Sequence, residues 1–218
     1  MWTLPNILTI FRLIAAPMVA VMFLYFTRPY ADWAALILFL GAALTDWLDG
    51  FLARALKQES KLGTMLDPIA DKAMVLIALV VLASVFGLDA LILLPAALIV
   101  FREVFVSGLR EFLGDVAGTL KVTKMAKWKT TVQMIAIALL FAVGIFKHYL
   151  VLGTPGLGHQ SVTGIISSAS AGSSYLAFYY NGMYLTWYSG VILLWIAAAL
   201  TVATGADYFR KALPHLRD

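Results

Sequence analysis

Long apolar runs dominate the chain and alternate with short polar stretches. A helix needs about 20 apolar residues to cross the roughly 30 Å hydrocarbon core of a bilayer. The stretches that meet this requirement are Pro5–Tyr25, Trp33–Leu56, Asp67–Phe86, Ala90–Leu109, Met125–Phe146 and Met183–Thr204. The pattern therefore predicts an all-α integral membrane protein with about six transmembrane helices, in a single domain over residues 1–218.

One long segment departs from this pattern. Val151–Gly182 is rich in glycine and serine, contains no Asp, Glu, Lys or Arg, and ends in aromatic residues. These features predict an extracytoplasmic loop over residues 151–182 whose aromatic side chains lie at the membrane interface and which contributes no site residue.

Composition supports a membrane protein and narrows its chemistry. Hydrophobic residues make up 62% of the chain and charged residues 13%, with no cysteine. Disulfides, zinc-thiolate sites and a cysteine nucleophile are thereby excluded. The histidines, His148, His159 and His215, are widely separated. Any bound metal is therefore expected to have oxygen ligands.

The cationic side chains are distributed asymmetrically. They gather in the second-to-third and fourth-to-fifth connections and in the C-terminal tail, at Arg54, Lys57, Lys61, Arg110, Lys121, Lys124, Arg210, Lys211 and Arg217. The opposite side has only Arg28 and Lys147. The positive-inside rule then predicts that both termini are cytoplasmic. This basic side favours anionic lipid or an anionic substrate, and no nucleic-acid partner is expected.

Four aspartates interrupt the apolar pattern in the segment TDWLDGFLARALKQESKLGTMLDPIADK. Asp46 and Asp49 share one face of a helix, and Asp67 and Asp71 are one turn apart on the next helix. We expect these two helices to face each other, so that the four carboxylates converge near the cytoplasmic side. The predicted connection, Ala55–Leu66, contains Gly63, which we interpret as a turn or a point of close approach.

Four carboxylates at membrane depth require a counter-ion. Charged groups there are costly unless they are paired, and clustered anions repel one another. Mg²⁺ or Mn²⁺ suits oxygen ligands, and two ions about 4 Å apart are the arrangement used in phosphoryl transfer. The segment therefore predicts a metal site formed by Asp46, Asp49, Asp67 and Asp71, acting on a phosphate or diphosphate.

Small residues lie beside the first aspartate pair. Gly50 and Ala53 share the helix face of Asp46 and Asp49 and could leave a groove for a ligand, although small residues are also common at helix contacts. Arg54 could bind a phosphate or extend its charge toward the interface.

The spacing D-x2-D-G-x2-A-R-x8-G-x3-D-x3-D resembles the signature of the CDP-alcohol phosphotransferase family at all its fixed positions. The resemblance implies two metal ions among the four aspartates, with Asp71 also the general base. It further implies that Asp49, Gly50, Ala53, Arg54 and Gly63 bind the cytidine nucleotide, and that the protein is a homodimer.

Further segments resemble the bacterial branch of this family that uses sn-glycerol 3-phosphate. They are TLPNILTIFRLIAAP, FREVFVSGLREFL and KWKTTVQM, within a resemblance that covers roughly Leu4–Leu140. It implies transfer of the phosphatidyl group from CDP-diacylglycerol to sn-glycerol 3-phosphate at the cytoplasmic side of a bacterial inner membrane. The segment Val151–Gly182 is longer than the family pattern suggests.

Polar residues on three other helices are consistent with this reaction. Asn6, Thr9 and Arg12 recur every three residues, and we expect Asn6 and Thr9 to bind CDP. Arg102, Arg110 and Lys129 are expected to bind the acceptor phosphate. Helix capping, an ion-pair network and positive-inside lysines are the alternative interpretations.

Three other functions stay open at this stage. A transferase of the same family could use inositol phosphate, serine or phosphatidylglycerol as acceptor. An aspartate-rich membrane prenyltransferase also binds a diphosphate through metals, and an ion carrier could use intramembrane aspartates. Neither a prenyltransferase nor an ion carrier explains the fixed spacing of Gly50, Ala53 and Arg54 as well as the family resemblance does.

Overall fold

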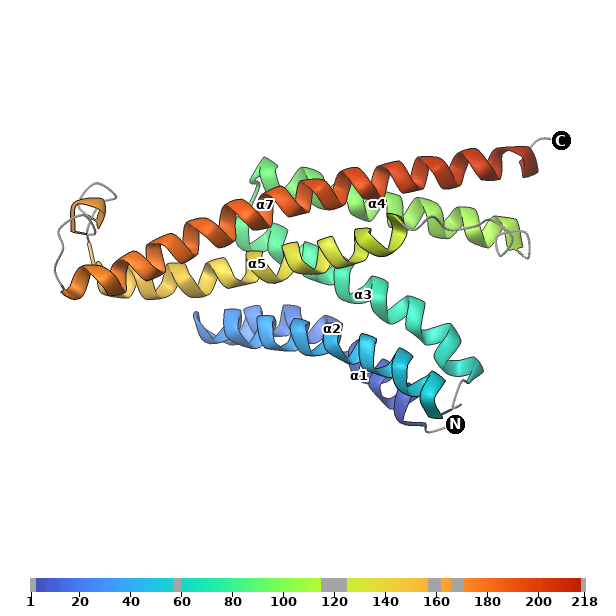
Figure 1. Cartoon of the computed structure of the whole chain (residues 1–218), viewed down its shortest axis with the longest axis horizontal. Helices are drawn as coiled ribbons and strands as arrows, with labels where there is room; N and C mark the ends of the chain where they lie inside the picture. The colour runs from blue at the N-terminus through green and yellow to red at the C-terminus, as the bar shows by residue number, and fades with distance from the viewer. Residues whose placement is uncertain (1–2, 57–59, 115–124, 157–161, 166–170, 217–218) are drawn as a thin grey trace.

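The computed structural model consists of long helices that run in alternating directions. It describes residues 3–56, 60–114, 125–156, 162–165 and 171–216, with the backbone but not the side chains of 46–56, 125–127 and 171–173. The helices are α1 (Leu4–Tyr25), α2 (Tyr30–Leu56), α3 (Lys61–Phe86), α4 (Ala90–Leu113), α5 (Met125–Gly153) and α7 (Ala171–Ala212), followed by the short 3-10 helix η2 (Leu213–His215). Both chain ends lie at the same end of the long axis (Figure 1).

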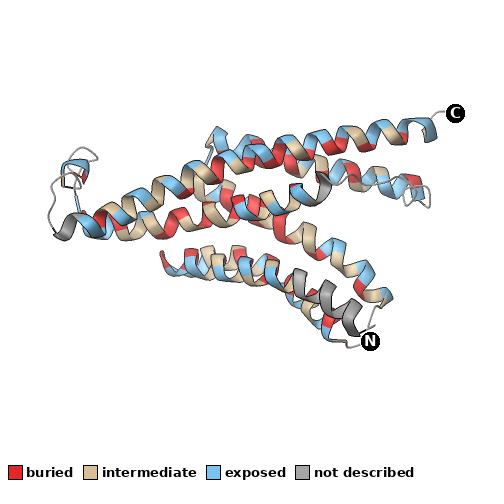
Figure 2. Cartoon of the chain, viewed as in Figure 1, coloured by how far each residue is buried: buried red, intermediate tan, exposed pale blue. Residues whose placement is uncertain are grey.

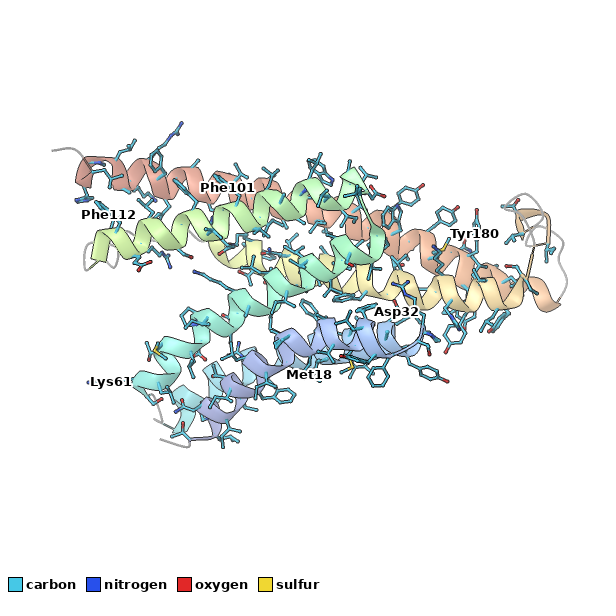
Figure 3. All side chains as sticks on the ribbon, turned by 180° about the vertical axis from the view of Figure 1, so that it is seen from behind. Met18, Asp32, Lys61, Phe101, Phe112 and Tyr180 are labelled. Carbon is cyan, nitrogen blue, oxygen red and sulfur yellow. The ribbon has the colours of Figure 1, made fainter. Side chains whose placement is uncertain are left out.

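The helices confirm an all-α, multi-pass membrane protein. Five of them, α1, α3, α4, α5 and α7, are long and apolar enough to cross a bilayer, and the first part of α2, Tyr30–Thr45, is a shorter apolar helix. Apolar side chains also cover the outer surface. Phe101 and Phe112 on α4 point away from the bundle (Figure 3) and are 69% and 76% exposed, as expected of residues in contact with lipid.

Local sequence signals set several helix ends. Ser60 caps α3 by accepting a hydrogen bond from the Gly63 amide at 3.0 Å, and Asp89 caps α4 through Leu91 at 2.8 Å. Gly87 and Gly114 end α3 and α4 with φ of 69° and 51°. Glycine adopts this region without the steric penalty that a side chain would add.

The bundle divides into two groups of helices. In the first, α1 packs along both α2 and α3; in the second, α7 packs along both α5 and α4. The groups diverge toward the end that holds the chain termini (Figure 1). A shared apolar core, which includes Phe39 of α2, Leu79 of α3 and Phe141 of α5, joins them away from that end. Figure 2 shows the buried residues concentrated where the helices meet.

Helix α1 packs against both aspartate helices, and among the described residues α2 and α3 have little direct contact. The side chains of Asp46 and Asp49 lie outside the described residues, so the facing of the two aspartate pairs stays a prediction. The connection between α2 and α3 is shorter than predicted. Because α2 continues to Leu56 and α3 begins at Lys61, Gly63 lies in the first turn of a helix and is not a turn between helices.

The predicted loop over residues 151–182 is also too long. Helix α5 continues to Gly153, residues 162–165 form a further helical turn, and α7 begins at Ala171. Aromatic packing between α5 and α7 accounts for the difference, because the rings of Phe146 and Phe178 lie 5.9 Å apart and those of Tyr149 and Tyr179 5.2 Å apart. These tertiary contacts outweigh the low helix propensity of glycine and serine.

A buried aspartate joins the two groups at the end opposite the termini. Asp32, at the start of α2, is 1% exposed and lies beside α5 (Figure 3), with Arg28 Nε 3.5 Å from its Oδ2. Gly144 of α5 makes room for it, since a Cβ there would lie 1.9 Å from Asp32 Oδ1. The two helices can approach this closely only because residue 144 lacks a side chain.

We predict that Gly144→Ala destabilises the protein by about 1–3 kcal/mol, because the added methyl group displaces a buried, ion-paired carboxylate. The measurement is the thermal unfolding midpoint in detergent. Gly41→Ala in α2 is the matched control, since a Cβ there meets nothing within 4 Å. Alanine favours a helix over glycine by about 1 kcal/mol, so the control should not lose stability. Equal midpoints for the two variants would contradict the close contact at Gly144.

Candidate functional site

Arg12 is the centre of a buried polar cluster between α1 and α3. Its side chain is 2% exposed, and its two terminal nitrogens donate to Asp71 Oδ1 at 2.5 Å and to Asp67 Oδ1 at 3.2 Å. Thr9, one turn earlier on α1, donates to the same Asp67 oxygen at 2.6 Å. The planar guanidinium suits this role because it can donate to two carboxylates in fixed directions.

The two aspartates are held from one side and accessible from the other. The side chains of Asp67 and Asp71 are 46% and 41% exposed, although Arg12 beneath them is buried. They lie one turn apart on α3, and their oxygens already converge on one cation. This geometry fits carboxylates that bind a charged ligand on their open side.

Gly63 connects α1 to the start of α3. Its amide donates to Ser60 Oγ, and the Ser60 hydroxyl donates to Asn6 Oδ1 at 2.8 Å. Asn6 is 2% exposed, and a Cβ on residue 63 would lie 2.7 Å from its oxygen. The prediction of a close-approach point at Gly63 is therefore confirmed. Asn6 and Thr9 are both buried. Asn6 holds the start of α3 through Ser60, and Thr9 holds Asp67.

The remaining residues of the aspartate motif lie at the C-terminal end of α2. The structure assigns Asp46, Asp49, Gly50, Ala53 and Arg54 to this helix, but their side chains are outside the described residues. Among the described side chains, no group of three metal-ligating residues comes together. The metal prediction for Asp46 and Asp49 thus falls outside what the structure describes.

A cavity of about 210 Å³ with several charged lining residues lies next to the Asp71 carboxylate, between α3, α4 and α5. Its lining residues are Pro68, Asp71, Lys72, Val75, Glu103, Lys129, Thr130 and Gln133. It lies between the two helix groups, since α3 belongs to the first and α4 and α5 to the second. The cavity brings together two carboxylates, two ammonium groups and neutral hydrogen-bonding groups.

Lys129 enters this cavity from the first part of α5. Its ammonium group donates to Glu103 Oε1, which also accepts from Arg102 Nη1 at 3.0 Å. The side chains of Lys129 and Glu103 are only 10% and 11% exposed. One buried carboxylate therefore serves two cations, the ammonium group of Lys129 and the guanidinium group of Arg102.

Lys72 is a cavity residue that the sequence analysis did not assign to the site. Its ammonium group donates to Ser107 Oγ at 2.6 Å, and the Ser107 hydroxyl donates to the Glu103 carbonyl at 2.6 Å. The signal that could have identified it is a lysine directly after Asp71, inside a helix that crosses the membrane, where an uncompensated cation is costly.

The two predicted arginines of α4 lie outside the cavity. The Arg102 guanidinium reaches α7, where Nη2 donates to Thr204 Oγ1 at 3.3 Å and its Cγ occupies the space beside Gly205. Arg110 stacks over the Tyr208 ring at 5.2 Å. The structure thus brings Lys129, but neither arginine, next to Asp71. The spacing of Arg102 and Arg110 on α4 would allow both to reach one phosphate, but each side chain contacts α7 instead.

The chain matches one protein family over most of its length. The family model described as CDP-alcohol phosphatidyltransferase matches residues 2–203. A relative from Cereibacter sphaeroides, named CDP-diacylglycerol--glycerol-3-phosphate 3-phosphatidyltransferase, is 57% identical over 218 residues, which cover 100% of this chain and 98% of the relative. A relative of the same name from Rickettsia bellii is 37% identical over 207 residues, covering 95% and 93%. Another from Pseudomonas fluorescens is 40% identical over 154 residues, covering 69% and 78%. The chain, whose aspartate motif places Asp71 in this cavity, belongs to the CDP-alcohol phosphatidyltransferase family.

Proposed function

We propose that the protein transfers the phosphatidyl group from CDP-diacylglycerol to sn-glycerol 3-phosphate, giving phosphatidylglycerophosphate and CMP. The observation that carries this proposal is the cavity in which the Asp71 carboxylate lies beside the ammonium groups of Lys72 and Lys129. The names of the relatives that match along the whole chain support the same reaction.

The charges around the cavity favour a phosphorylated acceptor. Two ammonium groups, those of Lys72 and Lys129, and two carboxylates, those of Asp71 and Glu103, line it. Lys129 shares Glu103 with Arg102, Asp71 is paired with Arg12, and Lys72 donates to the hydroxyl of Ser107. Each ammonium group has three donors, and the contacts to α4 use one from each lysine. The others can bind a phosphate oxygen. A phosphate can accept from both ammonium groups, whereas a neutral acceptor would gain no charge-assisted hydrogen bond of this kind between two charged groups.

Asp71 is the general base in this proposal. Its side chain is partly exposed and lines the cavity, while Arg12 fixes one carboxylate oxygen and stabilises the negative charge. Asp71 accepts the proton of the acceptor's primary hydroxyl. The hydroxyl oxygen forms a bond to the phosphorus that bears the diacylglycerol, the bond from that phosphorus to the CMP oxygen breaks, and CMP leaves with the electron pair.

The proposal includes Mg²⁺ or Mn²⁺, with two ions held by Asp46, Asp49, Asp67 and Asp71. The donor chemistry fits, because Asp67 and Asp71 present partly exposed carboxylates that converge on one cation, Arg12. When bound, such ions would neutralise the diphosphate of the substrate.

The nucleotide part of the proposal rests on the motif at the α2–α3 junction. Asp49, Gly50, Ala53, Arg54 and Gly63 would bind the CDP group, with only residues 57–60 between the two helices. Asn6 and Thr9 support this region from α1, through Ser60 and Asp67.

The cellular setting is also proposed. The basic residues at the ends of α2 and α4 and in the C-terminal tail favour a cytoplasmic active site in a bacterial inner membrane. A homodimer follows from the family resemblance alone.

We predict that membranes containing the protein convert CDP-diacylglycerol and labelled glycerol 3-phosphate, with Mg²⁺ or Mn²⁺, into labelled lipid and equimolar CMP. Asp71→Asn keeps the shape of the side chain but removes the base, so activity should fall by at least about a hundredfold. Labelled inositol phosphate and serine serve as comparison acceptors. Lipid formed from either in preference to glycerol 3-phosphate would overturn the proposed acceptor.

We also predict that Lys72→Met and Lys129→Met each raise the KM for glycerol 3-phosphate by roughly tenfold or more, because each removes a charge-assisted hydrogen bond to phosphate. The KM for CDP-diacylglycerol should change little. Lys147→Met is the matched control, since Lys147 is an exposed lysine at the far end of α5. If the control and the two variants share one KM for glycerol 3-phosphate, the phosphate does not bind between these lysines.

A further inference from the structure

Gln133 is a buried residue of the cavity with no role in the reaction as described so far. It lies on α5, one turn beyond Lys129, lines the cavity and is 2% exposed. Within the part of the chain that the structure describes, no partner reaches its amide nitrogen Nε2. By contrast, the ammonium groups of Lys72 and Lys129, the two cations that line the cavity, each donate to an acceptor on α4.

A buried amide without a partner is unfavourable for the empty protein. Buried polar groups are nearly always hydrogen-bonded, and the exceptions need an explanation such as a ligand or a catalytic role. Gln133 faces a cavity that is large enough for a small molecule, so a bound substrate is the simplest partner for its amide.

The position of Gln133 indicates which part of the substrate it meets. Helices α3 and α5 both run away from the end of the bundle where the chain terminates (Figure 1). Val75 therefore lies one turn further into the bundle than Asp71, and Gln133 lies one turn further than Lys129. The inner end of the cavity is thus lined by an apolar side chain and a neutral amide.

The charges along the cavity indicate where each end of a phosphorylated alcohol binds. A phosphate dianion is stabilised beside Lys72 and Lys129 and would be poorly stabilised beside Val75. A neutral hydroxyl needs only a hydrogen-bond partner, which the Gln133 amide supplies. The reacting primary hydroxyl is at Asp71, so the hydroxyl left for Gln133 is the secondary one on the adjacent carbon.

We infer that the Gln133 amide donates a hydrogen bond to the non-reacting C2 hydroxyl of the acceptor and thereby selects vicinal diol phosphates over acceptors that lack this group. The inference rests on the proposed function and adds a specificity-determining residue to it. No bond is made or broken at Gln133.

The test compares two acceptors in membranes that contain the full chain. Glycerol 3-phosphate is compared with propane-1,3-diol monophosphate, which keeps the primary hydroxyl and the phosphate but lacks the C2 hydroxyl. With the wild-type protein, kcat/KM should be roughly tenfold to a hundredfold lower for the analogue, because the analogue leaves the buried amide unpaired.

Gln133→Met preserves the length of the side chain and removes the amide. We predict that it lowers kcat/KM for glycerol 3-phosphate by the same factor and leaves the value for the analogue nearly unchanged, so that the ratio approaches one. Ile137→Ala, one turn further along α5 in the apolar core, is the control. The packing defect in this variant should lower kcat/KM for both acceptors alike, so the ratio of the two values should stay that of the wild type.

The outcomes separate the inference from the proposed function. A wild-type protein that makes no lipid from glycerol 3-phosphate overturns both. An active wild-type protein that uses the two acceptors equally, or a Gln133→Met variant that keeps the wild-type ratio, overturns the inference alone.

A stability measurement covers the case in which Gln133→Met is inactive toward both acceptors. The variant should unfold in detergent, without acceptor, at the same temperature as the wild type or a higher one, because it removes an unpaired buried amide. A glutamine that held the helices together would instead lower the midpoint when replaced, and that result would overturn the inference.

Discussion

The ion pair of Arg12 with Asp67 and Asp71 is the interaction on which the site depends. A buried guanidinium inside a transmembrane helix is costly by itself, and two carboxylates one turn apart repel each other. The ion pair compensates both costs, because the opposite charges stabilise each other. Arg12 is 2% exposed, whereas both carboxylates stay more than two-fifths exposed on their other side. Helix α1 thereby determines where the reactive face of α3 lies, although α1 contributes no carboxylate to the motif.

On the other side of the cavity, a buried anion holds cations. There, Glu103 of α4 is the buried anion that holds Lys129 and Arg102. The Asp71 carboxylate, held by a buried cation, and the Lys129 ammonium group, held by a buried anion, therefore line the same cavity. Such an arrangement suits a reaction between a diphosphate that needs cations and an acceptor that carries its own phosphate.

Much of the fold and part of the site could be predicted from the sequence. Apolar length identifies the helices because the bilayer imposes it, and the aspartate spacing identifies α2 and α3. Side-chain direction was less predictable. The spacing of Arg102 and Arg110 is compatible with a shared phosphate, but α7 attracts both, through Thr204 and Tyr208. These partners lie about a hundred residues away along the chain, so no local pattern reveals them. Lys72 differs, because its position directly after Asp71 in a membrane-crossing helix is a local signal, although its partner on α4 is not.

The division of the bundle into two helix groups has a mechanical consequence. One wall of the cavity belongs to α3 and the others to α4 and α5, and the groups diverge toward the open end (Figure 1). The width of the cavity is therefore set by an interhelical angle and not by local packing alone. Membrane thickness acts on the tilt of transmembrane helices. A change of bilayer that tilts one helix group relative to the other would therefore change the distance between Asp71 and Lys129.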